Sequence, residues 1–308
     1  MFARRHPYLF FMLICFCLFT VVVICFASVI TLMVRSADKD APFSARNRHR
    51  QGTAVGVVKI EGPITDSQKT LEQICQFRED DTIKAIVIRI DSPGGAVGPA
   101  QEIYREIRKT AEEKTVVASL GAVAASGGYY VACAADGIVA NPGTITGSIG
   151  VIMGYTNFEQ LLEKIGMVPV VIKSGPYKDT GSPTRKMQDD EREILEKVTS
   201  GIHEQFITAI AEGRKMKREK VAAAADGRIF TGEMAEKQGL VDRLGNFEDA
   251  LAWAGELGGV IGPVKPVYPP EEKLSVLRQI LSSSAVPGWV SHFINPDIYA
   301  EYRYQPGP

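Results

Sequence analysis

The sequence is poor in cysteine and histidine and has no excess of charge of either sign. Its 308 residues include five cysteines and four histidines, and 35 Lys and Arg face 36 Asp and Glu, for a formal net charge of −1. No CxxC pair occurs, which excludes the common zinc-binding patterns and a disulfide scaffold. The balanced charge offers no basic surface for nucleic acid. We therefore expect no metal, no cofactor and no nucleic-acid partner.

Only two cysteines lie outside the apolar N-terminus. Cys75 and Cys133 could form one disulfide, but Cys133 ends the apolar run YYVAC of residues 129–133. A cysteine in such a run is typically a buried free thiol, and this is the interpretation that we favour.

A long apolar run is present at the N-terminus. Residues 8–34 contain no charged side chain, and about 20 apolar residues are enough to span a bilayer. A cleaved secretory signal is the alternative, but its apolar region is usually only about 7–15 residues long. We interpret residues 1–34 as a short tail and an uncleaved transmembrane helix, which contacts membrane lipid through residues 8–34. Basic residues lie on both sides of this run, so the charges leave its orientation undecided.

The rest of the chain divides into a linker, one domain and a tail. Residues 35–52 are polar and basic without periodicity, as in a juxtamembrane linker. From 53 to 261, apolar β-branched runs, among them residues 168–173, alternate with helical patterns. The helical patterns lie near residues 66–78, 97–113, 157–166, 188–213 and 216–224. This alternation predicts an α/β domain whose parallel sheet is covered on both faces. Residues 262–308 form a tail of unknown role.

Three glycine-rich turns follow apolar strands and are candidates for the chemistry. They are DSPGG at residues 91–95, AASGG at 124–128 and TGSIG at 146–150. At the C-terminal ends of parallel strands, glycine lets backbone N–H groups approach a negatively charged oxygen. The second turn has the strand–turn–helix context of a nucleophile elbow with Ser126 at its centre, although Ala124 replaces the first glycine of the G-x-S-x-G pattern.

A serine nucleophile needs a base, and the histidines are poorly placed to provide one. His6 and His49 precede the domain, His203 lies within a predicted helix and His292 lies in the tail. A Ser-His-Asp triad is therefore disfavoured, and a desolvated lysine is the alternative base. Lys178, in a turn after an expected strand, is the best placed lysine, although its position alone favours an ordinary solvated lysine.

Six motifs, taken together and in this order, resemble the membrane-anchored signal peptide peptidase family in its shorter bacterial form. They are IEGPI at 60–64, IDSPGG at 90–95, AASGGYY at 124–130, GSIGVI at 147–152, KSGPYKDTGSP at 173–183 and GRIFTG at 227–232. The resemblance covers residues 53–258, and linked motifs are far more specific than any one of them. It implies a Ser/Lys-dyad serine protease with a Clp-protease/crotonase-like fold, whose substrates are signal peptides left in the membrane and other apolar peptides.

The resemblance also implies roles for particular residues. Ser126 matches the nucleophile, Lys178 the general base, and Ser148 the hydroxyl that orients the lysine. The backbone N–H groups of Gly95 and Gly127 match the oxyanion hole. Without the resemblance, Ser148 could equally be a turn serine that satisfies local backbone groups.

We further expect a substrate pocket for small or medium apolar side chains. Its candidate lining residues are Val97, Leu120, Val123 and Ile149.

The resemblance extends to topology and assembly. It implies a cytoplasmic N-terminus and a protease domain on the periplasmic side of the inner membrane. It implies a homo-oligomer, with an octamer as the expected size, in which the dyad residues meet across subunits. Because a carboxylate facing the lysine would favour its charged form, we expect Asp179 to point away from the Lys178 amine.

Two other functions fit the same fold. A crotonase-like acyl-CoA enzyme also holds an oxyanion with glycine N–H groups, but such enzymes generally place carboxylates near the thioester. The sequence has no Asp or Glu between Ser119 and Ala135. A non-catalytic membrane scaffold is the other alternative, and it predicts an unreactive Ser126.

Overall fold

The computed structural model describes residues 8, 19–20, 54–270 and 301–303. The chain divides into two compact units, residues 1–49 and 50–308, and the fold described below belongs to the second. The expected transmembrane run 8–34 and linker 35–52 fall almost wholly outside the described residues. Within the part of the chain that is described, no helix is both long and apolar enough to cross a bilayer.

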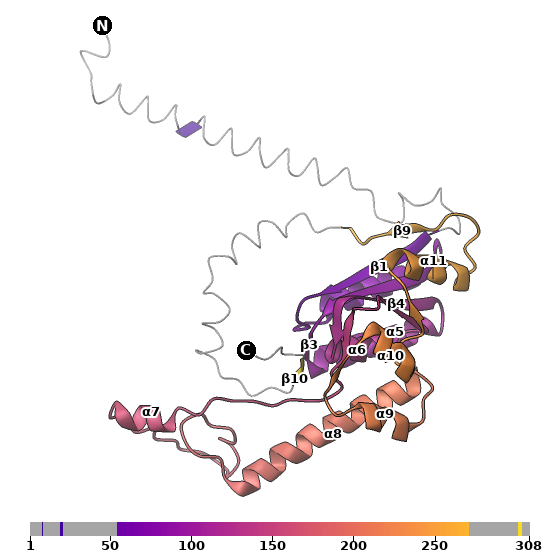
Figure 1. The fold of residues 1–308 in the computed structure, drawn as a ribbon. Coiled ribbons are helices and arrows are strands. Elements are labelled where there is room, and N and C mark those ends of the chain that lie inside the picture. Colours follow the sequence, from indigo (N-terminus) through magenta and orange to yellow (C-terminus); the bar gives the residue numbers. More distant parts are fainter. Residues whose placement is uncertain (1–7, 9–18, 21–53, 271–300, 304–308) are drawn as a thin grey trace. The chain divides into compact units, whose positions relative to one another are not determined.

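An eight-stranded sheet forms the centre of the second unit (Figure 1). Its strands are β1 (Ala54–Glu61), β2 (Ile83–Ser92), β4 (Thr115–Ala125), β5 (Gly137–Ala140), β6 (Ile145–Gly147), β7 (Ile229–Thr231), β8 (Arg243–Leu244) and β9 (Lys265–Val267). They run in the order β7-β6-β4-β2-β1-β9, and β5 pairs with β4 and β8. Among these described strands only β6 and β7 pair antiparallel. The mixed, mainly parallel sheet confirms the predicted α/β class.

Helices cover both faces of this sheet. On one face, α11 (Phe247–Leu257) packs against a buried cluster that includes Val57 and Val87. Successive strand residues point to opposite faces, and Gly56 meets the Phe77 ring of α4 (Gln68–Glu79), so α4 lies on the other face. Burial on both faces explains why the central strands are almost continuously apolar.

The remaining helices are α5 (Val97–Ala111), α6 (Gly127–Ala132), α7 (Glu159–Lys164), α8 (Asp189–Gly213), α9 (Arg218–Ala224) and α10 (Gly232–Gln238). Of these, α5, α7, α8 and α9 lie close to the predicted positions. The acidic start of α8 suits a helix N-terminus, and Glu191 completes a capping box there with Gln188. Local composition and a capping box therefore fix the start of α8.

One expected strand is absent from the sheet. Residues 151–187, which we call the arm, carry α7 away from the sheet in Figure 1. The apolar run 168–173 lies in this arm without strand pairing, and Val168 and Ile172 are 83% and 98% exposed. The strand prediction was wrong because a β-branched run forms a strand only beside a neighbouring strand, and none of the described strands pairs with it.

A second, two-stranded sheet joins the C-terminal segment to the domain. There, β10 (Glu301–Arg303) pairs antiparallel with β3 (Gly94–Ala96), with Tyr302 opposite Gly95. The edge of β3 beside the predicted oxyanion glycine can therefore hold an extended peptide backbone.

Both described cysteines outside the N-terminus are free thiols. Cys133 is fully buried and Cys75 is half-buried, which confirms the interpretation of Cys133. Burial raises the pKa of the Cys133 thiol to about 12, so this thiol stays protonated and unreactive at neutral pH.

Candidate active site

The three glycine-rich turns meet at one end of the sheet. Ser92 of β2 pairs with Ala124 of β4, and Ala125 of β4 pairs with Gly147 of β6. The chain leaves these neighbouring parallel strands at the same edge, where glycine-rich turns follow each of them. The structure therefore brings together the turns that the sequence singled out separately.

Ser126 occupies a strained turn between β4 and α6. Its φ of 53° and ψ of −118° lie outside the regions that non-glycine residues ordinarily adopt. Two backbone hydrogen bonds hold it, from Ser126 N–H to the Gly147 oxygen and from Tyr130 N–H to the Ser126 oxygen, both 2.8 Å long. Such a strand–turn–helix geometry is the one that nucleophile elbows use to present a hydroxyl.

The surroundings of Ser126 are rigid. All six residues of α6 are buried, and the Tyr129 hydroxyl donates a 2.8 Å hydrogen bond to the Leu240 carbonyl. Ser126 itself is only 1% exposed. Strain of this kind persists only where the neighbouring structure over-determines it, and the buried helix and paired strands provide that support.

The two predicted oxyanion donors are Gly127, which directly follows Ser126, and Gly95 of β3. Gly127 begins α6, so its N–H belongs to the first helical turn and has no partner within the helix. Gly95 lies in β3, whose one edge is held by Ile64 through hydrogen bonds of 2.9 Å to Gly94 and 2.8 Å from Ala96. Since strand residues alternate in direction, the Gly95 N–H faces the other edge, beside β10.

Gly95 is fixed as glycine by close packing. A Cβ at this position would lie 2.2 Å from the Ile64 carbonyl oxygen, a distance that no side chain tolerates. The preceding Gly94 has a φ of 96° and donates its N–H to Ser92 Oγ at 3.1 Å. Gly94 therefore shapes the turn, and Gly95 lets two backbones approach each other.

Ser148 directly follows the end of β6, as Ser126 directly follows the end of the neighbouring strand β4. It follows Gly147 as Ser126 follows Ala125, and these two preceding residues are paired. Ser148 also has a positive φ, of 50°, and its N–H donates to the Arg228 oxygen at 2.8 Å. The GRIFTG motif thus braces the Ser148 turn, a role that the sequence did not reveal although the motif itself was conspicuous.

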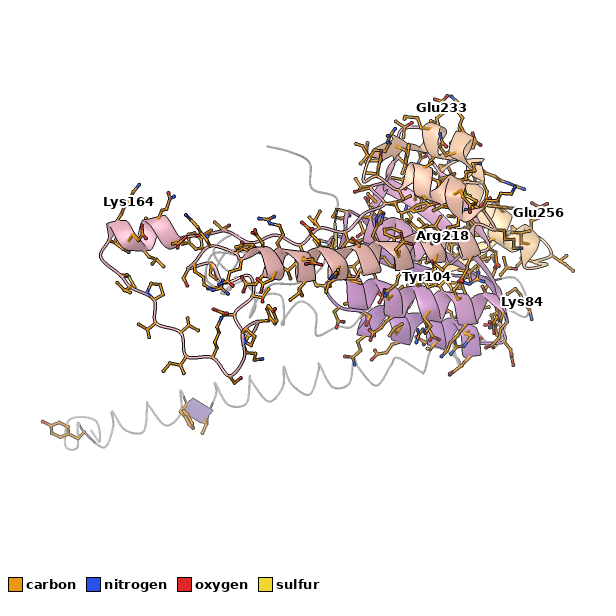
Figure 2. All side chains as sticks on the ribbon, turned by 90° about the horizontal axis from the view of Figure 1, so that it is seen from below. Lys84, Tyr104, Lys164, Arg218, Glu233 and Glu256 are labelled. Carbon is orange, nitrogen blue, oxygen red and sulfur yellow. The ribbon has the colours of Figure 1, made fainter. Side chains whose placement is uncertain are left out.

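Lys178 is not brought to Ser126 within one copy of the chain. It lies on the arm, its side chain is exposed, and no hydrogen bond between described residues joins it to Ser126. Figure 2 shows Lys164 of α7 at the far end of this arm, well separated from Lys84 and Tyr104 on the domain. The structure therefore assembles the serine, the second hydroxyl and the glycine donors, and leaves the predicted base apart.

The carboxylate next to Lys178 is bound elsewhere. Asp179 accepts hydrogen bonds from Lys173 Nζ at 2.6 Å and from Arg185 Nε at 2.9 Å. These bonds hold the pKa of the Asp179 carboxyl well below its usual range. The expectation that Asp179 turns to partners other than Lys178 agrees with this geometry.

The predicted pocket residues differ in exposure. Leu120 and Ile149 are buried in the core, whereas Val97 and Val123 are half-buried. A pocket of about 450 Å³ lies elsewhere, between the chain that follows Ile149 and helix α8. Its apolar lining includes Val151, Ile152, Met153 and Leu195. The role of the four predicted residues stays a prediction, and the pocket beside α8 was not predicted.

The described residues contain no cluster of three or more His, Cys, Asp or Glu that could hold a metal ion. The groups that the site offers for chemistry are the hydroxyls of Ser126 and Ser148 and backbone N–H donors. Lys178, the predicted base, lies on the arm.

Comparisons with known proteins cover the domain that holds this site. The sequence profile described as Peptidase family S49 matches residues 108–260, and the Clp protease profile matches residues 53–146. Together the two profiles cover residues 53–260, which include the three glycine-rich turns at the end of the sheet. The domain therefore has a Clp-protease-like α/β fold.

Three relatives illustrate the range of similarity. A putative protease of Synechocystis sp. is 44% identical over 220 residues, which are 71% of this chain and 78% of the relative. A putative signal peptide peptidase SppA of Enterococcus faecium is 37% identical over 185 residues, or 60% of this chain and 54% of the relative. The chloroplastic serine protease SPPA of Arabidopsis thaliana is 34% identical over 242 residues, or 76% of this chain and 35% of that protein.

Proposed function

The chain belongs to peptidase family S49 and is a serine peptidase, and on this basis we propose that it is a membrane-anchored endopeptidase with Ser126 as nucleophile and Lys178 as general base. Its proposed substrates are remnant signal peptides and other apolar peptides. The observation that carries the proposal is the strained, rigidly supported position of Ser126 at the end of the sheet where the glycine-rich turns meet.

The proposed reaction begins with proton transfer from Ser126 Oγ to the neutral amine of Lys178. The oxygen attacks the scissile carbonyl carbon, and the N–H groups of Gly95 and Gly127 stabilise the resulting oxyanion. Collapse of the tetrahedral intermediate breaks the C–N bond, and the lysine returns the proton to the leaving amine. Water then hydrolyses the acyl-enzyme by the same proton transfers, and Ser148 orients the lysine.

We place Lys178 of one copy beside Ser126 of a neighbouring copy. The support is the separation of the two residues within one chain and the apolar surface of the arm. Met167, Val168, Val170, Val171 and Ile172 are all more than half exposed. Contiguous apolar surface of this kind usually marks a protein–protein interface. A homo-oligomer, with an octamer as the proposed size, would cover it and complete the site.

The pairing of β10 with β3 supports a mode of substrate binding. An extended peptide that adds a strand to a sheet edge gains main-chain hydrogen bonds without regard to its side chains. On the β3 edge, such a peptide would place its carbonyl groups beside the Gly95 N–H. Selectivity for apolar side chains would then come from the surrounding pocket surface.

The proposed location rests on the apolar run at residues 8–34 and, for its orientation, on the family resemblance. An anchor at residues 8–34 would hold the domain at the periplasmic face of the inner membrane, where apolar peptides remain after preprotein cleavage. A tether of this kind raises the local concentration of enzyme at the substrate's own surface.

A serine-reactive fluorophosphonate probe tests the nucleophile, and a panel of synthetic signal peptides tests the substrate class. We expect the probe to label Ser126 alone, and mass spectrometry to show cleavage of Leu- and Ala-rich peptides but not of matched peptides with Asp at the scissile position, since burying an unpaired charge costs several kcal/mol. Absence of labelling would favour the scaffold, and turnover of acyl-CoA thioesters would favour the crotonase-like enzyme.

A further inference from the structure

The turn that carries Lys178 is held by side chains, not by a sheet or a helix. Its backbone bonds are short-range: Lys178 N–H donates to the Gly175 oxygen at 3.3 Å, and Thr180 N–H donates to the Tyr177 oxygen at 3.2 Å. Turns of this kind on an exposed arm are mobile unless other groups fix them. A base that must reach a nucleophile across a subunit boundary needs such fixing.

Asp179 supplies it from the next position in the chain. Its side chain is 13% exposed, although most of the arm is open to solvent. One carboxylate oxygen pairs with Lys173, which precedes the turn, and the other pairs with Arg185, which follows it. Lys173 Nζ also donates to the Pro176 oxygen at 2.7 Å, and Arg185 donates to the Asp179 carbonyl at 3.1 Å. The turn is therefore tied on both flanks.

The network continues into α8. Arg185 also donates to both carboxylate oxygens of Glu191, whose side chain is 2% exposed. Glu191 in turn accepts the Gln188 N–H at 2.9 Å and caps the helix. Since the C-terminal half of α8 is buried against the domain at Phe206 and Ile210, the ion pairs connect the turn to a rigid element.

We propose that Asp179 is a positioning residue for Lys178, acting through its ion pairs with Lys173 and Arg185; this rests on the role of Lys178 as general base proposed above. The network fixes the direction of the lysine and balances charge around it. Two cations, Lys173 and Arg185, offset two carboxylates, Asp179 and Glu191, so that the neighbouring carboxylate does not stabilise the ammonium form of the base.

The charged groups around this turn determine in which direction the pH dependence of activity should move when one of them is removed. In one copy they are Lys173, Asp179, Arg185, Asp190 and Glu191. Removal of the Asp179 charge leaves Lys173 and Arg185 offset by Glu191 alone, and this excess of positive charge disfavours a further cation, so that the neutral amine forms at lower pH. Removal of the Lys173 charge has the opposite effect. A purely structural role for these residues would change the amount of active enzyme but not this pH dependence.

The test is the pH profile of kcat for a fluorogenic Leu-containing peptide, measured on the full chain in detergent micelles. For Asp179→Asn we expect kcat to fall about tenfold or more, KM to stay within about twofold, and the acidic limb to move to lower pH by about half a unit or more. Asp179→Glu should restore at least part of the rate. Glu233→Gln, which removes an exposed carboxylate paired with Lys237 on α10, is the matched control and should leave kcat unchanged.

Lys173→Met provides a second test if Asp179→Asn does not assemble. It leaves the Arg185 bonds in place, and we expect its acidic limb to move to higher pH. The positioning role would be overturned if Asp179→Asn had the kcat and the acidic limb of the wild-type pH profile. If Asp179→Asn does not assemble, the same result for Lys173→Met would overturn it. If Lys178 is not the general base, Lys178→Ala will be active. This result does not depend on the activity of the Asp179 variants, so the two failures can be distinguished.

Discussion

The backbone N–H of Ser126 donates a 2.8 Å hydrogen bond to the carbonyl oxygen of Gly147. This bond links the end of β4 to the end of β6 and sets the hydroxyls of Ser126 and Ser148 on neighbouring turns. The strained geometry of both serines depends on this link, so the site is a property of the sheet edge and not of a mobile loop.

Ser126→Ala should abolish peptidase activity and preserve the fold. The substitution removes the only proposed covalent nucleophile, and we expect kcat/KM to fall by about a thousandfold or more. Peptide hydrolysis and circular dichroism on the same sample measure the two effects. Thr208→Ala, which changes an exposed hydroxyl on α8, is the control and should be fully active. Near wild-type turnover by Ser126→Ala would remove the assignment.

Lys178→Ala and Lys178→Arg should both be inactive, because a guanidinium stays protonated and cannot accept the serine proton. With the wild-type chain, activity should rise with pH along a single limb below the ordinary lysine value of about 10.4. A flat profile between about pH 6 and 10, or an active Lys178→Arg enzyme, would exclude Lys178 as the base and make His203 the next candidate.

Mixing two inactive variants should restore activity if the dyad forms between copies. In a random 1:1 assembly of Ser126→Ala and Lys178→Ala chains, about a quarter of the interfaces would join an intact serine to an intact lysine. We expect about that fraction of wild-type activity after co-expression. Mixtures as inactive as their components, in oligomers of normal size, would show that the two residues act within one chain.

Deleting residues 271–308 should lower KM for extended peptide substrates. The deletion removes β10, which occupies the β3 edge beside Gly95, and leaves β9 in the main sheet. The β3 edge is then open to substrate without competition from the chain itself. Steady-state kinetics with the full chain as reference measure the change. An unchanged KM would indicate that peptides bind elsewhere.

Removing residues 1–34 should leave an active oligomer in detergent-free buffer. Ser126, Ser148, Lys178 and both glycine donors lie in the domain that follows, so the anchor supplies location and not chemistry. Light scattering and peptide hydrolysis on the truncated protein test this. A truncation that assembles normally but is inactive would show that the N-terminal segment takes part in catalysis.

The arm should lose stability in acid through Glu191. Arg185 and the Gln188 N–H lower the pKa of Glu191 to about 2 from an ordinary value of 4.5. Because the folded-state pKa is the lower one, the contribution of this carboxylate to stability is complete above pH 4.5 and is lost as the pH falls towards 2. In the inactive Ser126→Ala background, Glu191→Gln should lower the free energy of unfolding at pH 6. The size of this decrease should shrink below pH 4.5. A difference that does not change with pH would contradict this.

The parts of the fold that depend on local sequence were predictable. Apolar β-branched runs and acidic helix starts placed β1, β2, β4 and α8, because burial on both faces and capping act over a few residues. The glycine-rich turns around Gly95, Ser126 and Ser148 were predictable for the same reason, since the geometry they need is encoded at the turn itself.

The parts that depend on distant partners were not predictable. The run 168–173 has the composition of a strand, yet no strand among the residues that the structure describes pairs with it. The bracing of Ser148 by Arg228 joins residues 80 positions apart, and no local pattern reports such a contact. The ion pairs of Asp179 likewise depend on how the arm folds back on itself.

The separation of serine and lysine within one chain bears on how the cell is protected from the enzyme. If Lys178 of one copy serves Ser126 of another, as proposed, a newly synthesised copy is latent until copies gather. Specific activity should therefore fall on dilution below the concentration at which the copies part. Hydrolysis would then follow the crowding of copies in the membrane, and a stray single molecule would leave other proteins intact.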